Sequence, residues 1–187
     1  MRRVALVMLM VLGLVPALCA PAAAGATPDG VVKRFYGAWM AVVGADPYVK
    51  GSEERCLQAQ RACFEPSFYA VFMKAWNLNT GTAPIEGFDF DPFLNAQTGF
   101  TALRVGRPVG AGSAMKVPVY ARESRGGRPV GPEGLRATAV VTRHDGAWVI
   151  SDVLSPQPST KESPSSLRAL SAQLVADHAR RNQKRKP

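Results

Sequence analysis

LRATAVVTRHDGAWVISDVL, residues 135–154, joins two runs of alternating apolar and polar residues through the pair Asp145-Gly146. Such alternation is typical of strands that bury one face, because successive side chains of a strand point to opposite sides. An Asp-Gly pair between two alternating runs is a strong signal for a tight antiparallel turn. The stretch therefore predicts a β-hairpin with strands over 135–143 and 147–154.

Two more alternating runs precede this hairpin. Residues 100–109 predict a strand, Gly110-Ala111-Gly112 a turn, and 115–121 a second strand. Pro118 lies inside the second run and has no N–H to donate, which favours a sheet edge or a bulge there. Together with the hairpin, these runs predict an antiparallel sheet of three to four long strands.

The residues before the strands follow a helical period instead. Apolar side chains recur at every fourth position over 30–43, which predicts an amphipathic helix that begins at Asp29 and ends at Gly44. A short helix over 52–60 follows, and Pro66-Ser67 then begins another. The N-terminal half of the exported chain is therefore predicted to be helical.

The end of the chain predicts one more helix. Pro, Ser and Thr crowd 155–164, which is typical of a linker, and 165–180 then carries apolar residues at helical spacing. Helices followed by antiparallel strands predict an α+β domain whose helices gather on one face of the sheet. We expect this domain over 27–160, a C-terminal helix over 161–181 and a disordered basic tail over 182–187.

The N-terminus predicts a secretory signal peptide over 1–26. Arg2 and Arg3 precede an apolar run over 4–18, and Ala24-Gly25-Ala26 provides small residues for cleavage. Cleavage after Ala24 or Ala20 is an alternative. The expected location is the periplasm or the outside of the cell.

Two other fates of this N-terminus are less compatible with the sequence. A helix of about 15 residues rises about 22 Å, which is short of the roughly 30 Å hydrocarbon core of a membrane. No transmembrane span is therefore expected after processing. Cys19 leaves lipid attachment open, although Leu18 stands before it where a small residue is needed.

Cys56 and Cys63 remain in the exported chain, where an even number of cysteines favours a disulfide. Seven residues of continuous helix would separate their Cα atoms by about 10 Å, beyond the limit of roughly 7 Å for a bridge. A disulfide therefore requires a bend between the two residues. Two buried thiols are the alternative.

The positive charge of the chain lies mainly at its ends. The formal net charge is +9, and Arg2 and Arg3 belong to the predicted signal peptide. Five further cations stand near the C-terminus: Arg180, Arg181, Lys184, Arg185 and Lys186. This group could bind an anionic lipid, lipopolysaccharide or an acidic protein, with a solvated tail as the alternative. Export argues against nucleic acid as the partner.

Several strings of the sequence resemble one family. They are Phe35-Tyr36, DPFLNAQ at 91–97, VPVY at 117–120, WVISDV at 148–153 and SLRAL at 166–170. The chain resembles, over about 30–172, the bacterial envelope family called domain of unknown function 3828, within the nuclear transport factor 2-like, cystatin-like superfamily. The resemblance implies a cone in which a curved sheet wraps a long helix around a pocket, and it implies no activity. Thr98 departs from the family pattern, which often has Asp there.

The DPFLNAQ string supplies the first candidate binding residues. Asp91, Asn95 and Gln97 could line the mouth of the implied pocket and offer donors and acceptors to a ligand. Asp91-Pro92 is also a helix-start or turn signal, because Asp accepts from backbone N–H groups and Pro suits a first helical position. Capping is therefore the alternative role of Asp91.

Tyr36, Tyr120 and Asp152 complete the candidate set. Asp152 alternates with Trp148 and Ile150 and would need a partner if buried, such as Tyr120 or an arginine. A catalytic alternative uses Asp91 or Asp152 as base and a tyrosine as donor to an oxyanion.

The sequence offers no pattern for a metal or a cofactor. His144 and His178 stand 34 residues apart in different predicted elements. No phosphate loop, dinucleotide fingerprint or Gly-x-Ser-x-Gly is present.

We therefore predict an exported, non-catalytic protein of the bacterial cell envelope that binds a small molecule or an envelope protein. One alternative is a small pocket enzyme, an isomerase, lyase or hydrolase with a carboxylate base. The other is an accessory subunit that docks on an envelope complex through its sheet face.

Overall fold

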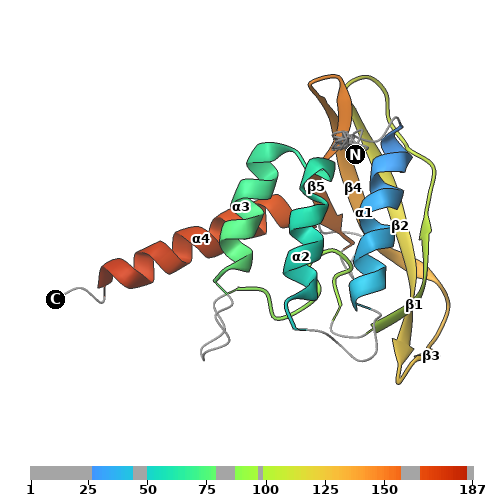
Figure 1. Ribbon diagram of the computed structural model, residues 1–187, viewed down its shortest axis with the longest axis horizontal. Helices are drawn as coiled ribbons and strands as arrows, with labels where there is room; N and C mark the ends of the chain where they lie inside the picture. The colour runs from blue at the N-terminus through green and yellow to red at the C-terminus, as the bar shows by residue number, and fades with distance from the viewer. Residues whose placement is uncertain (1–26, 44–49, 79–86, 97–98, 157–164, 185–187) are drawn as a thin grey trace, which may run out of the picture.

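The computed structural model describes residues 27–43, 50–78, 87–96, 99–156 and 165–184 (Figure 1). The predicted signal peptide, Gln97, Arg185 and Lys186 lie outside these ranges. The helices are α1 (Pro28–Val43), α2 (Ser52–Ala59), the 3-10 helix η1 (Arg61–Cys63), α3 (Pro66–Trp76) and α4 (Leu167–Lys184). The strands are β1 (Gly99–Val105), β2 (Ala114–Arg125), β3 (Arg128–Pro129), β4 (Gly134–His144), β5 (Ala147–Ser155) and β6 (Ser165–Ser166). The predicted α+β class is confirmed.

The strands form one antiparallel sheet in the order β1-β2-β4-β5-β6, with β3 paired to β2. Four of the six strands are long, as expected, and the other two have only two residues each. Pro118 does not lie at a sheet edge, because β2 runs between β1 and β4. A register shift between Val119 and Tyr120 follows it directly, so the bulge alternative holds.

The predicted hairpin is confirmed in β4 and β5. His144 pairs with Ala147 across the turn, and Asp145 and Gly146 have φ values of 49° and 79°. Positive φ at both central residues is the geometry of the tight hairpin turn that Asp-Gly favours. The local sequence therefore explains this turn fully.

The start of α1 differs from the prediction by two residues. Thr27 caps the helix, because its Oγ1 accepts from the Gly30 N–H at 3.1 Å, and Pro28 occupies the first helical position. Asp29 instead pairs with Lys33 one turn later, at 2.6 Å. A Thr-Pro pair thus outcompetes the Asp that follows it.

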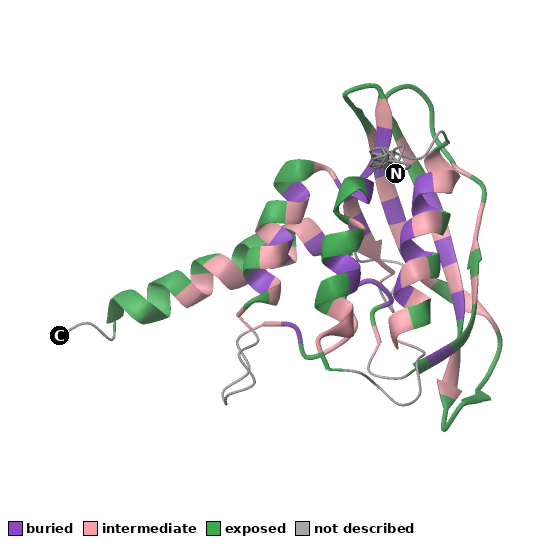
Figure 2. Cartoon of the chain, viewed as in Figure 1, coloured by how far each residue is buried: buried purple, intermediate pink, exposed green. Residues whose placement is uncertain are grey.

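One part of the core lies between α1 and the sheet, and the same core continues to α2, η1, α3 and residues 88–94 (Figure 2). α1 contributes large side chains, among them Phe35, Tyr36 and Trp39, each at most 1% exposed. The facing residues of β2 and β4 are small: Val117, Val119, Ala121, Ala137, Ala139 and Val141. Small strand residues make room for aromatic helix residues, which is how one helix can cover the middle of the sheet.

The predicted disulfide is not present. Cys56 on α2 and Cys63 on η1 are both free and buried. The chain does bend between them at Gln60, but the Cys63 thiol donates to Gln60 Oε1 at 3.5 Å rather than joining Cys56. Burial raises the pKa of both thiols, so both stay protonated at neutral pH.

α4 packs against α3 and β5 at its start and then projects away from the rest of the chain (Figure 1). It ends at Lys184, so residues 182–184, assigned to a disordered tail, are helical. Its second half is mainly exposed (Figure 2). None of the described helices is long and apolar enough to cross a membrane.

Candidate functional site

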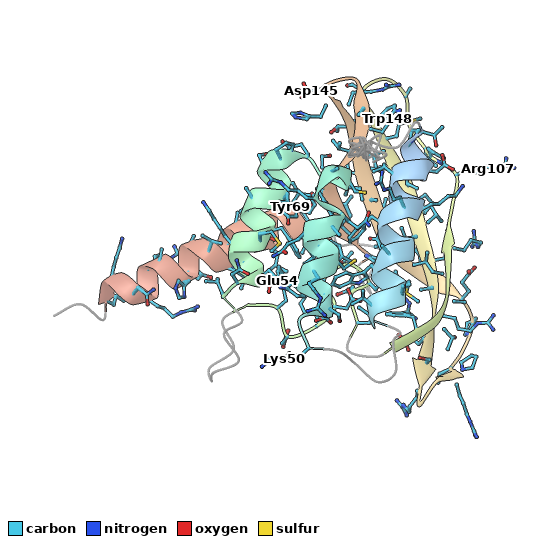
Figure 3. The ribbon with its side chains drawn as sticks, viewed as in Figure 1. Lys50, Glu54, Tyr69, Arg107, Asp145 and Trp148 are labelled. Atoms are coloured by element: carbon cyan, nitrogen blue, oxygen red, sulfur yellow. The ribbon has the colours of Figure 1, made fainter. Side chains whose placement is uncertain are left out.

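A cleft of about 740 Å³ opens between α1, α2, the end of α3 and the chain around Asp91, and we call it the acidic cleft. Its aromatic lining residues are Trp39, Trp76, Phe88, Phe90 and Phe100. Its charged lining residues are Lys50, Glu53, Glu54, Asp89 and Asp91. Lys50 and Glu54 lie where α2 begins (Figure 3). The volume falls within the range of small-molecule sites.

The charge of the acidic cleft opposes that of the chain. Four carboxylates and one ammonium line it, whereas the whole chain has a net charge of +9. The carboxylate of Glu53 is close enough to Asp91 that its charge raises the pKa of Asp91. A cation in the cleft would relieve this repulsion.

Asp91 is held by a dense set of donors. Its carboxylate accepts from the Trp39 indole N–H at 3.1 Å, and its Oδ1 accepts from the backbone N–H groups of Phe93 and Leu94 at 2.9 and 3.1 Å. The capping role foreseen for Asp91 is therefore present, together with a link to α1. The same residue also lines the acidic cleft, and its predicted role in ligand binding stays a prediction.

The pKa of Asp91 is raised above its usual value. Burial is the largest cause, and it outweighs the opposing hydrogen bonds from Trp39, Phe93 and Leu94. The negative charge of Glu53 adds to the rise. Protonation of Asp91 is thus easier in the folded chain than in the unfolded one.

Tyr36 is fully buried beneath this segment and does not line the acidic cleft. Its hydroxyl donates to the Phe93 carbonyl at 3.0 Å. Burial, aided by the charge of Asp91, raises its pKa well above the usual value, so it stays protonated. Phe93 itself packs its ring within about 5 Å of Phe35 and Trp39, at 4.7 and 4.9 Å between centroids. Tyr36 therefore anchors the segment.

Asn95 serves the turn that carries Asp91. It is exposed and has a φ of 49°, a left-handed conformation that Asn tolerates better than most residues. The turn closes where the Asp91 N–H donates to the Ala96 carbonyl at 2.8 Å. Gln97 lies outside the described residues, so its predicted place at the pocket mouth stays a prediction.

Asp152 lies on β5, does not line the acidic cleft and holds the start of α4. Its carboxylate accepts from the Ser166 hydroxyl at 2.6 Å and from the Arg168 backbone N–H at 2.9 Å. Ser166 in turn accepts from the Ala169 N–H at 3.0 Å. The partner foreseen for Asp152 is therefore an arginine, but through its backbone rather than its guanidinium.

Glu65 forms a second junction beside it, which the sequence patterns did not single out. It precedes α3 and accepts from the N–H groups of Ser67 and Phe68 at 3.0 and 2.8 Å. The Arg168 guanidinium donates to Glu65 at 3.2 Å and to the Ser151 carbonyl at 3.3 Å. One side chain thus ties α3, α4 and β5 together. The Glu-Pro pair at 65–66 was the available signal for the cap.

Tyr120 lies on β2 and is absent from the lining of the acidic cleft. The Arg104 guanidinium stacks 4.1 Å from its ring centre, and Arg104 also pairs with Glu133 at 2.8 Å. This arrangement stabilises the exposed side of the sheet. The structure therefore separates Tyr120 and Asp152 from Asp91 and does not bring the predicted set together.

The lining residues from α2 and α3 were missed by sequence reasoning. The polar run over 52–60 predicted only a short helix, and Pro66-Ser67 predicted only the start of another. Their approach to Asp91 depends on contacts between segments remote in the chain, which no local pattern encodes. In the part of the chain that the structure describes, no group of three His, Cys, Asp or Glu side chains could hold a metal ion.

No protein-family model matches the chain, and no curated protein matches it. Among solved structures, a SEC-C motif containing protein from Rhodopseudomonas palustris is similar at 22% identity and a TM-score of 0.25. The match covers 65% of this chain and 92% of the other. We therefore infer the function from the residues of this chain alone.

Proposed function

We propose that the protein is an exported binding protein of the bacterial cell envelope, which holds an organic cation in the acidic cleft without catalysis. The observation that carries this proposal is the joint presence of aromatic rings and four carboxylates around one cavity. Aromatic faces attract cations through their quadrupole, and carboxylates attract them directly. A ligand with an apolar body and a positive charge satisfies both features.

The bonds of Asp91 support binding rather than catalysis. A general base needs a free lone pair in reach of the proton that it removes. Oδ1 of Asp91 already accepts two backbone N–H groups and shares the Trp39 indole N–H with Oδ2. These donors fix the carboxylate in the fold and leave free acceptor capacity only on Oδ2, and its charge contributes to the potential of the cleft.

The location in the envelope rests on the N-terminal sequence, with its charged start, apolar run and small residues before Thr27. The mass of the protein purified from its own host tests it. A chain that begins at residue 21, 25 or 27 supports export, whereas a full-length chain contradicts it.

We further propose that the fold is a nuclear transport factor 2-like cone, as the resemblance to domain of unknown function 3828 implies. The long helix α1 laid across an antiparallel sheet supports this assignment. An experimental structure in which the sheet curves around α1, as in a nuclear transport factor 2-like cone, would establish the fold.

The end of α4 supports a further contact with an anionic surface. Arg180, Arg181 and Lys184 are exposed on the half of the helix that projects from the domain. Arg180 pairs with Asp177, so the described part of this end keeps a net positive charge. We propose that it approaches an anionic lipid surface, where each added cation contributes about 1 kcal/mol.

Binding of 1-naphthylmethylammonium, followed by calorimetry, tests the proposed cleft. We expect the wild-type protein to prefer this cation over the neutral analogue 1-naphthalenemethanol. The double variant Glu54→Gln/Asp89→Asn should weaken cation binding about five- to tenfold, because two exposed charge contacts together contribute about 1 to 1.4 kcal/mol. Both residues are exposed, so the fold should persist.

The variant Asp177→Asn is the matched control, since it removes one carboxylate on α4 outside the cleft. It should bind the cation as the wild type does. Equal binding of the cation and the neutral analogue, or equal binding by wild type and double variant, would overturn the proposed ligand class.

A further inference from the structure

A second cavity, of about 480 Å³, lies between the β4–β5 hairpin and the turn that joins α2 to α3, and we call it the hairpin groove. Phe64, Pro66, Ala147 and Val149 give it apolar walls. Tyr69 and Asp145, which Figure 3 labels, come to it from α3 and from the hairpin turn. It shares no lining residue with the acidic cleft.

The polar groups of the hairpin groove are few and lie around apolar surface. Arg61 is exposed, with its guanidinium carbon 5.7 Å from the ring centre of Tyr69. Burial is the largest cause that raises the pKa of Tyr69. The charge of Arg61 lowers this pKa and the charge of Glu54 raises it. The hydroxyl therefore remains a donor at neutral pH. Apolar walls with a few convergent polar groups are typical of small-molecule sites.

The charges around the groove favour an anion. Arg61 is permanently positive, and a guanidinium offers paired donors to a carboxylate. Asp145 is the one carboxylate among the lining residues; its side chain is 93% exposed and lies 3.5 Å from the His144 ring nitrogen. Solvent therefore weakens its repulsion of a ligand. α2 ends and α3 begins here, so their helix dipoles have opposite effects on a bound anion. The side chains therefore decide which charge the groove prefers.

We propose that the hairpin groove is a second binding site, which takes a small carboxylate with an apolar body through Arg61 and the Tyr69 hydroxyl. The apolar body lies against Phe64 and Val149, and the carboxylate faces Arg61. This site is distinct from the acidic cleft, because the two cavities differ in lining residues and in charge. The charge of a cation that suits the acidic cleft is repelled by Arg61 of the hairpin groove, and the charge of a carboxylate that suits the groove is repelled by the carboxylates of the cleft.

The probe for this site is 1-naphthoate, whose apolar body matches that of the cation used for the acidic cleft. We expect 1-naphthoate to bind the full chain with chemical-shift changes at Tyr69, Ala147 and Val149. The neutral 1-naphthalenemethanol should bind the groove at least tenfold more weakly. Arg61→Gln should weaken binding of 1-naphthoate ten- to a hundredfold, as expected for loss of a charge-assisted contact.

Arg55→Gln provides the matched control, because it removes an exposed cation from α2 outside the groove. It should leave the dissociation constant within twofold of the wild type. Tyr69→Phe keeps the ring and removes the hydroxyl, so it should weaken 1-naphthoate and leave the neutral analogue unchanged.

Three results would overturn the second site: no binding of 1-naphthoate, equal affinity in Arg61→Gln, or shift changes confined to the acidic cleft. Thermal unfolding of each variant shows whether a loss of binding is a loss of fold. The variant Glu54→Gln/Asp89→Asn separates the two proposals, since it should weaken the naphthyl cation and not 1-naphthoate.

Discussion

Asp91 shows how one residue can hold the fold together and also line a cavity. It bridges α1 and the turn at 91–96 through Trp39, Phe93 and Leu94, and it borders the acidic cleft. The two roles differ in what they require of the side chain. The fold needs its acceptor oxygens, whereas a cation needs its charge.

Asp91→Ala should lower the free energy of unfolding by about 2 to 4 kcal/mol, because it leaves the Trp39 indole and two backbone N–H groups without this acceptor. Urea unfolding followed by circular dichroism measures the loss. In a Trp39→Phe background, which has no indole N–H, the same substitution should cost less. An equal cost in both backgrounds would mean that the Trp39 hydrogen bond contributes no stability.

The pKa of Glu65 is lowered in the folded chain, whereas the pKa of Asp91 is raised. Its burial would raise its pKa, but the hydrogen bonds from Ser67 and Phe68 and the charge of Arg168 lower it to about 2. The unfolded chain has the usual value of 4.5 and binds the proton first. The stabilisation by Glu65 is therefore full above 4.5 and is lost as the pH falls toward 2.

Glu65→Gln should cost about 1 to 2 kcal/mol at pH 7, as for the loss of a charged helix cap. The gap between the variant and the wild type should close between pH 4.5 and 2. Urea unfolding at a series of pH values measures both effects. Asp177→Asn is a control with an exposed ion pair, and its gap to the wild type should stay near zero. A pH-independent gap for Glu65→Gln would contradict the role of the charge.

At the scale of elements, local sequence patterns predicted the helices and strands that depend on local interactions. The β4–β5 hairpin follows from alternation and from Asp145-Gly146, both of which take the positive φ that the turn requires. α1 follows from its apolar period, and the start of α3 follows from Pro66-Ser67. The start of α1 was misplaced because Thr27 and Asp29 both suit a helix cap, and the local sequence does not rank them.

Contacts between remote elements were beyond the reach of those patterns. Trp39 meets Asp91 across 52 residues, and Arg168 meets Glu65 across 103. The candidate site was therefore predicted only through Asp91, while Tyr120 and Asp152 proved to hold other parts of the fold. The bend at Gln60 was foreseen as a condition for a disulfide, yet the side chain of Cys63 turns to Gln60 instead.

The two halves of α4 should differ in what their removal does. Only Leu167 and Ser171 of this helix are fully buried, and both belong to its first half. Deletion of residues 177–187 should therefore change the melting temperature by less than about 2 °C, within the effect of surface changes. The deletion should abolish binding to vesicles that contain anionic lipid, followed by co-sedimentation at low salt.

Vesicles of neutral lipid are the control for that experiment and should bind neither protein. Retained binding to anionic vesicles after the deletion would contradict the proposed role of the helix end. A large fall in melting temperature would instead show that the projecting half supports the domain. The two readouts thus test separate statements about one helix.

At the scale of the whole molecule, two cavities of opposite preference lie at the two ends of α2. Lys50, Glu53 and Glu54 line the acidic cleft where α2 begins, and Gln58 and Ala59 line the hairpin groove where it ends. A helix of eight residues is about 12 Å long. Charges of opposite sign bound at that distance attract each other weakly, so 1-naphthoate should slightly strengthen binding of the cation.

The pKa of Asp91 links cation binding to pH. In the free protein, burial and the charge of Glu53 raise this pKa, and a bound cation favours the ionised form and lowers it. Binding should therefore release a proton at a pH where free Asp91 is partly protonated. It follows that affinity for 1-naphthylmethylammonium is highest at pH 7 and falls as the pH approaches 4.

Calorimetry at a series of pH values below 7, each in two buffers that differ in ionisation enthalpy, measures this release, because a released proton makes the observed heat depend on the buffer. The probe stays charged throughout this range, so the proton must come from the protein. Asp91→Asn, if it folds, should bind with an affinity that varies less with pH. An affinity that is the same at pH 7 and pH 4 would show that the charge of Asp91 does not contribute to cation binding. This residue would then have only its structural role.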